Sequence, residues 1–200
     1  MPKLLKLLVT IFILIGLLGC GQLHIRSQKW IDRPTQKIDQ LSIAWVSNAS
    51  GDWSGTSSNQ NFTANSFSGA GIPAIANELD FGKIGGYFKT EGSALLRSQG
   101  FVGQVEATDS TKEMVKIIQA TNSQKYWLVF EAVRIRSIAT QTGPMVFIAV
   151  TASLKDMQAG KEIWTGTYDL QAKKNLIDGR QFDSPMVKDM VAAALKSIAM

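Results

Sequence analysis

Three strand-like segments follow one another in the second half of the chain, separated only by turn-sized gaps. Residues 126–138, 145–154 and 162–170 are rich in β-branched and aromatic side chains, a composition typical of strands. Residues 141–144 and 155–161 supply glycine, proline and polar side chains between them, as hairpin turns do. This feature predicts an antiparallel meander, against which the other elements must pack.

Two shorter strands and a first helix are predicted before the meander. Residues 41–46 and 101–105 have strand composition, and residues 47–71 between them are rich in Ser, Asn and Gly. Apolar residues recur at helical spacing over residues 75–99, and Gly100 follows as a C-terminal cap. Interior glycines at positions 82, 85, 86 and 92 cost about 1 kcal/mol each relative to alanine, so we expect an interrupted helix or two pieces.

Two further helices are predicted by their ends and faces. Ser110 and Glu113 form a capping box ahead of a short apolar repeat. Pro185 opens the last helix, whose apolar residues fall on one face; they are Val187, Met190, Val191, Ala194, Leu195 and Ile198. The element order β-α-β-α-β-β-β-α predicts one α/β (α+β) domain with a mixed sheet over residues 41–200, because helices between early strands imply parallel crossovers.

The N-terminus has the order of an export signal. Lys3 and Lys6 precede an apolar run over residues 7–18, which is shorter than the roughly 20 residues that cross a bilayer. The run ends at Cys20, the one cysteine of the chain. A plain secretory signal with an unpaired thiol and an uncleaved membrane anchor are the alternatives; the first is disfavoured because an oxidising compartment makes such a thiol a liability.

Leu17-Leu18-Gly19-Cys20 resembles the bacterial lipobox. The resemblance implies that residues 1–19 are a signal peptide, removed on export, and that Cys20 carries a diacylglycerol and an acyl chain such as palmitate. Residues 20–40 would then be a lipid-anchored tether. Because Gly21 rather than Asp follows the cysteine, the resemblance implies the periplasm-facing outer membrane, while the inner membrane and the cell surface stay open.

Aromatic residues mark the polar segment 47–71 as a candidate partner-binding loop. Trp53, Phe62 and Phe67 are set among its Ser, Asn and Gly residues, and exposed aromatics on a loop suit protein recognition. The alternative is that the three side chains fold back onto the core.

The residue types that carry chemistry are scarce. His24 is the sole histidine and falls in the expected tether, so neither a catalytic triad nor a histidine-based metal site can be assembled in the domain. We therefore expect no enzyme activity, metal or cofactor. Removing residues 1–19 lowers the formal net charge from +5 to about +3 with scattered cations, which gives a nucleic-acid partner little support. Glu131 is expected to pair with Arg134 or Arg136 rather than to act in catalysis.

The second predicted hairpin has a recognisable pattern, L-x-D-x-x-x-G-x-x-x-W-x-G, with Asp156, Gly160 and Trp164 at its turn positions. Asp156 can accept turn amides, and Gly160 can take a positive φ. The pattern resembles a hairpin of periplasmic lipoproteins with the CsgG-like, TolB-N-terminal-like or LpoB-like α/β fold. That resemblance implies a fold and an envelope setting, and no catalytic residue.

Three functions remain for this sequence. The first is a non-enzymatic membrane-anchored lipoprotein that acts as a protein-interaction or assembly factor in the bacterial envelope. The second is an oligomeric secretion-pore subunit, for which residues 126–138 and 145–154 are long enough, so a homo-oligomer stays open. A cell-wall or lipid hydrolase is the least favoured, because no nucleophile and base converge.

Overall fold

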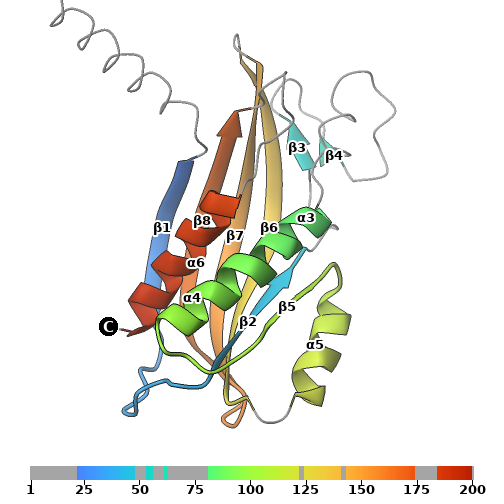
Figure 1. The fold of residues 1–200 in the computed structure, drawn as a ribbon. Helices are drawn as coiled ribbons and strands as arrows, with labels where there is room; N and C mark the ends of the chain where they lie inside the picture. Colours follow the sequence, from blue (N-terminus) through green and yellow to red (C-terminus); the bar gives the residue numbers. More distant parts are fainter. Residues whose placement is uncertain are drawn as a thin grey trace, which may run out of the picture.

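A mixed β-sheet runs the length of the structure (Figure 1). The structure is a computed structural model, and it describes residues 22–47, 53–55, 61–62, 81–121, 124–140, 143–173 and 184–199. The strands are β1 (Gln22–Trp30), β2 (Leu41–Val46), β3 (Trp53–Gly55), β4 (Asn61–Phe62), β5 (Val105–Thr108), β6 (Tyr126–Thr140), β7 (Gly143–Asp156) and β8 (Lys161–Lys173). The helices are α3 (Phe81–Tyr87), a π-helical turn (Phe88–Gly92), α4 (Ser93–Ser98), α5 (Thr111–Ala120) and α6 (Ser184–Ala199).

The strand order across the sheet is β1-β8-β7-β6-β2-β5. β2 pairs in parallel with both β5 and β6, whereas β6, β7, β8 and β1 pair antiparallel in succession. The short strand β3 lies parallel to the far part of β6 and pairs with β4. The predicted mixed α/β domain with an antiparallel meander is therefore confirmed.

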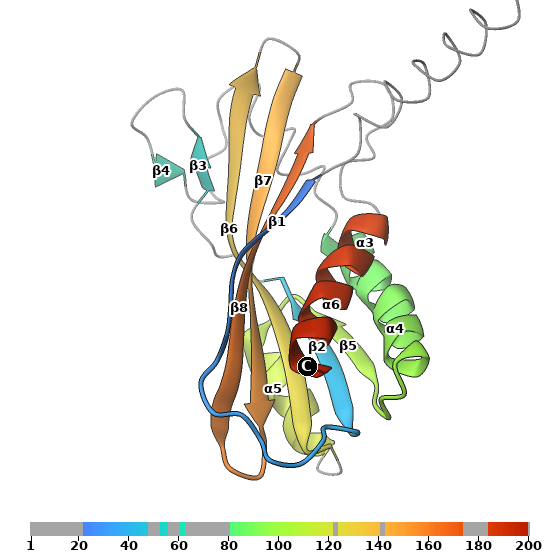
Figure 2. The ribbon, with the colours of Figure 1, turned by 90° about the vertical axis from the view of Figure 1, so that its left-hand side faces the viewer.

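One face of the sheet is covered by α3, α4 and α6, which lie on the same side in Figure 2. The core between them contains a row of aromatic rings from four elements. Trp45 of β2 stacks on Phe88 at 4.6 Å between centroids, Phe88 meets Phe130 of β6 at 5.2 Å, and Phe130 meets Tyr168 of β8 at 6.3 Å. All six residues predicted for the inner face of α6 are buried, so the closing helix packs on the sheet as its pattern predicts.

Glycines let the helix that precedes β5 approach the sheet closely. A Cβ atom on Gly85 would lie 3.1 Å from Cβ of Ala107, and one on Gly92 would lie 3.3 Å from Cγ2 of Val105. The predicted interruption of this helix takes the form of the π-helical turn. The helix ends at Gly100, whose φ of +78° and the bond from the Phe101 amide to the Leu96 carbonyl (2.9 Å) close a glycine C-cap.

The opposite face of the sheet is covered by α5 over β2 and the start of β6. Met114 and Ile118 of α5 bury against Ala44, Val46, Trp127 and Val129. The helix begins at the predicted N-cap, with the Ser110 hydroxyl accepting from the Glu113 amide. The return bond of the capping box runs through Thr108, whose hydroxyl accepts from the Ser110 amide and donates to the Glu113 carboxylate. The remaining strands on this side, β7, β8 and β1, keep small residues partly exposed.

Three local predictions are wrong. Gln22–Trp30 is not part of a tether but the edge strand β1, paired with β8 from Gln22↔Gln171 to Trp30↔Trp164. The bounds of the strand predicted at residues 101–105 are wrong: Val102 forms an isolated parallel bridge with Gln40, and the strand itself runs over Val105–Thr108, paired with β2 from Ile43↔Val105. Residues 47–71 are not entirely a loop, because β3 and β4 form within them.

Candidate functional site

The lipidation candidate, Cys20, lies outside the described residues, but the structure places the chain next to it. β1 begins at Gln22, two residues further along. Gln22 pairs with Gln171, and Gln171 pairs with Phe147 of β7, which pairs with Arg136 of β6. This row lies towards one end of the sheet, which we call the anchor end.

Two of the three aromatic candidates also come to the anchor end. Trp53 pairs with Phe62 across β3 and β4, and on its other side pairs with Ile135 of β6, one residue from the row that contains Gln22. Figure 1 shows β3 and β4 beside the upper part of β6. Phe67 lies outside the described residues. The fold therefore brings Trp53 and Phe62 together, at the end of the sheet where the anchor residue joins.

The residues of the hairpin pattern lie at the opposite end of the sheet. One carboxylate oxygen of Asp156 accepts from the amides of Gln158 and Ala159, both at 2.9 Å. Gly160 has a φ of +64°, and Trp164 is fully buried with its indole nitrogen donating to Ser197 of α6 at 3.2 Å. Asp156 and Gly160 thus shape the turn, and Trp164 joins β8 to α6.

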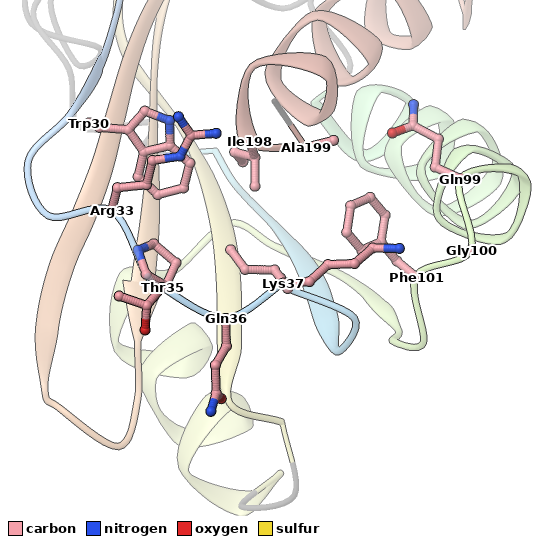
Figure 3. A pocket seen from close by; sticks show the side chains of 12 residues that line it. Trp30, Arg33, Thr35, Gln36, Lys37, Gln99, Gly100, Phe101, Ile198 and Ala199 are labelled. Atoms are coloured by element: carbon pink, nitrogen blue, oxygen red, sulfur yellow. The ribbon is translucent and has the colours of Figure 1, made fainter.

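A cleft of about 490 Å³ lies between the β1–β2 connection and the ends of α4 and α6 (Figure 3). This volume falls within the usual range for small-molecule sites, roughly 300–1,000 Å³. Its apolar surface comes from Trp30, Ile38, Phe101 and Ile198, of which the last three are buried. Figure 3 shows Trp30 and Arg33 on one side and Phe101 on the other.

Among the described residues that line the cleft, the charged ones are Arg33 and Lys37, and none is acidic. The Arg33 guanidinium sits 5.6 Å from the centroid of the Trp30 ring, within cation–π range. The α6 C-terminus carries the negative end of the helix dipole, so it attracts these cations from within the protein. Sequence analysis missed the cleft because it assigned residues 30–38 to the tether.

A second surface, which we call the open face, spans β7 and β8 on the side away from α6. It consists of Ala149, Thr151, Ser153, Thr165, Thr167 and Asp169, all partly exposed. Thr151 pairs with Thr167 and Ser153 with Thr165, so the hydroxyls form rows across the strands. β1 extends the rows with Ser27 and Lys29, and Arg26 pairs with Asp169. The result is a surface on which small side chains, most of them hydroxyls, predominate.

The buried polar contacts hold β1 to the core. Gln28 donates to the Tyr168 hydroxyl at 2.8 Å and to the Ala193 carbonyl of α6 at 3.2 Å. Burial raises the pKa of the Tyr168 phenol to about 12, against an opposing effect of the Gln28 hydrogen bond. At the other end of β1, a hydrogen bond to Asp32 raises the pKa of Lys161.

The described residues show no group of three or more His, Cys, Asp or Glu side chains that could hold a metal ion. His24 lies on β1 opposite Asp169, rather than in a tether. Glu131 is partly buried on β6 and has an interaction partner. None of the helices in the described ranges is long and apolar enough to cross a membrane.

Comparison with known proteins reveals weak structural likenesses only. No protein-family profile and no curated protein matches the sequence. A PelC dodecamer from Paraburkholderia phytofirmans is 14% identical, with a TM-score of 0.43 over 90% of this chain and 98% of that one. A protein from Xanthomonas campestris is 11% identical, with a TM-score of 0.42 over 84% of this chain and 91% of that one. A lipoprotein from Neisseria meningitidis is 14% identical, with a TM-score of 0.35 over 79% of this chain and 97% of that one. Likenesses this weak assign no function to the chain.

Proposed function

We propose that this chain is a non-enzymatic lipoprotein of the bacterial envelope, held by acyl chains on Cys20, that acts as a protein-interaction or assembly factor. The observation that carries the proposal is the start of β1 at Gln22, two residues after the cysteine of the lipobox-like segment. Two acylated groups on one cysteine anchor a protein stably, since each buried methylene contributes about 0.8 kcal/mol. We assign the anchor to the periplasm-facing leaflet of the outer membrane.

The open face supports a role in protein binding. Its Thr, Ser and Ala side chains have few rotatable bonds, so a partner that packs on them orders little side-chain freedom. Its rows of hydroxyls can donate hydrogen bonds to a partner and accept hydrogen bonds from it. Trp53 and Phe62, at the anchor end beside β6, remain candidates for an aromatic contact with the same partner.

The composition of the cleft supports a non-enzymatic role. The part of its lining that the structure describes holds Arg33 and Lys37 but no Cys, His, Asp or Glu. Near the C-termini of α4 and α6, the two cations can neutralise a bound anion or the negative ends of the helix dipoles. The described lining offers no general base beside them, which nucleophilic or acid–base chemistry requires.

The anchor is tested by replacing Cys20. In the native host, we expect the wild-type protein to incorporate labelled palmitate and to sediment with outer membranes, whereas Cys20→Ser takes no label and leaves that fraction. Fluorescence of the buried tryptophans Trp45, Trp127 and Trp164 reports whether the variant is folded. A Cys20→Ser protein that still travels with outer membranes, or a wild type without label, would refute the anchor.

The interaction role is tested on the open face. Thr167→Arg places a long cation in the middle of the hydroxyl rows, and Thr90→Arg places one on the exposed surface of the π-helical turn. After crosslinking in intact cells, we expect wild type and Thr90→Arg to sediment in the same larger complex and Thr167→Arg to lose it. If Thr167→Arg retains the complex, the open face is not the interface. A complex that holds only copies of this chain would favour the homo-oligomeric alternative.

A further inference from the structure

The β6–β7 hairpin reaches further along the sheet than the residue that carries the anchor. Gln22, Phe147 and Arg136 lie in one row across the strands. From this row, β7 continues back by four residues to Gly143, and β6 continues forward by four residues to Thr140. Figure 2 shows both strands extending past the start of β1.

The lengths can be compared with strand geometry. Four residues of extended strand reach about 13 Å beyond the row. The two residues that join Gln22 to Cys20 reach at most about 7 Å. Even a fully extended link therefore leaves the end of the hairpin about 6 Å further out than the Cys20 backbone. When the strands run along the membrane normal, a leaflet that holds the acyl chains of Cys20 also meets the end of β6 and β7.

The amino acids at this position suit such a surface. Residues 137–140 and 143–147 read Ser-Ile-Ala-Thr and Gly-Pro-Met-Val-Phe, with no charged residue. Arg134 and Arg136 precede them on β6, and Lys173 pairs with Met145 at the end of β8. Residues 132–140, 143–150 and 170–173 contain no acidic residue. An uncharged segment backed by cations is the pattern of a surface that enters an anionic lipid interface.

We propose that the end of the β6–β7 hairpin, residues 137–140 and 143–147, lies in the headgroup region of the leaflet that carries the Cys20 lipid, and that the basic positions 134, 136 and 173 on the strands behind it favour an anionic lipid surface. This inference rests on the proposed lipidation of Cys20. It makes the anchor end a two-point contact: the acyl chains attach at the edge strand β1, and the hairpin contacts lipid two strands away, across β8. Two contacts fix the tilt of the sheet, and Trp53 and Phe62 are then held next to the bilayer.

The single native cysteine provides the means of testing this contact. When Cys20 is acylated, a cysteine introduced elsewhere is the one thiol that can be labelled. In the full-length lipidated protein, Met145→Cys places a polarity-sensitive fluorophore on the hairpin, and Met157→Cys places the same fluorophore on the exposed turn at the far end of the sheet. Each protein is reconstituted into phosphatidylethanolamine–phosphatidylglycerol vesicles that contain nitroxide-labelled lipid.

We expect the Met145→Cys probe to show blue-shifted emission and several-fold stronger quenching by the nitroxide lipid than the Met157→Cys probe. Equal quenching at the two positions would overturn the inference. Mass spectrometry of the same samples separates the two proposals: acylated Cys20 with equal quenching leaves the anchor and removes the hairpin contact. An unmodified Cys20 overturns both.

The cations give a second measurement. Exchanging phosphatidylglycerol for phosphatidylcholine should reduce quenching at Met145→Cys, because the attraction to anionic phosphates is lost. Replacing Arg134, Arg136 and Lys173 together by Gln should make the quenching independent of this exchange. The matched change of Lys112 and Lys116 on α5 to Gln, which removes exposed cations away from the anchor end, should leave the dependence intact. If quenching at Met145→Cys does not depend on phosphatidylglycerol while Arg134, Arg136 and Lys173 are all present, the proposed attraction to anionic lipid is wrong.

Discussion

Individual residues account for where the strands and helices can come close. Gly166 of β8 lies between Trp164 and Tyr168 on the helix-covered face, and all three are buried. A Cβ atom at Gly166 would lie 2.7 Å from the Trp164 ring and 3.0 Å from the Tyr168 hydroxyl. The absence of a side chain therefore allows two large aromatic rings to pack beside each other on one strand.

Gly166→Ala is expected to destabilise the protein by about 1–3 kcal/mol, because the added methyl overfills a packed core. Gly86→Ala is the matched control. Gly86 is exposed on α3, and a Cβ atom there would meet no neighbouring atom within 4 Å, so the change should stabilise by about 0.5–1 kcal/mol. Urea denaturation of both variants measures the difference, and equal free energies of unfolding would contradict the packing argument.

Tyr168 predicts a loss of stability in alkaline solution. Burial raises the pKa of its phenol from 10.0 to about 12 in the folded protein. Below the lower value both states are protonated, so the contribution of the neutral phenol is complete. Between the two values the unfolded chain releases its proton first, and stability falls as pH rises. Urea midpoints across this window should decline more steeply for wild type than for Tyr168→Phe; parallel curves would show that the phenol does not titrate as stated.

At the scale of elements, the helices and strands with a regular sequence pattern could be predicted, whereas the edge strand β1 could not. The meander strands β6–β8, the capped helix α5 and the closing helix α6 each carry an uninterrupted period or a local end signal. β1 carries neither. Leu23 and Trp30 both pack against the core, but a register shift between Ile25 and Ser27 breaks the alternation between them. The pairing with β8 cannot be seen in the sequence, where this segment has the polar, aperiodic composition of a tether.

The contrast between local patterns and long-range pairing also decides which parts of the candidate sites could be predicted from the sequence. Asp156 and Gly160 act within one turn, so their roles could be read from local spacing. The cleft joins residues 30–38 with the ends of α4 and α6, and the row at the anchor end joins β1, β8, β7 and β6. Long-range pairing of this kind leaves no local pattern in a single sequence.

Hydrogen exchange distinguishes an edge strand from a tether. We expect amides of Gln22–Trp30 that face β8 to exchange far more slowly than those of residues 35–37, which form no strand. Uniformly fast exchange over residues 22–40 would mean that β1 does not form and that the anchor is joined to the domain by a flexible link.

At the scale of the whole molecule, the sheet has two chemically different ends. The anchor end holds the start of β1, the β6–β7 hairpin, Trp53 and Phe62, and the cations Arg134, Arg136 and Lys173. The other end holds the Asp156–Gly160 turn and the cleft beside Trp30. An anchor at Cys20 would direct the first end to the membrane and present the second, with much of the open face, to the compartment beyond.

The most direct test of this arrangement is the mass of the mature N-terminal peptide from the native envelope. We predict a chain that begins at Cys20 and carries both a thioether-linked diacylglycerol and an amide-linked acyl chain. A free thiol at Cys20, or a chain that retains residues 1–19, would contradict it.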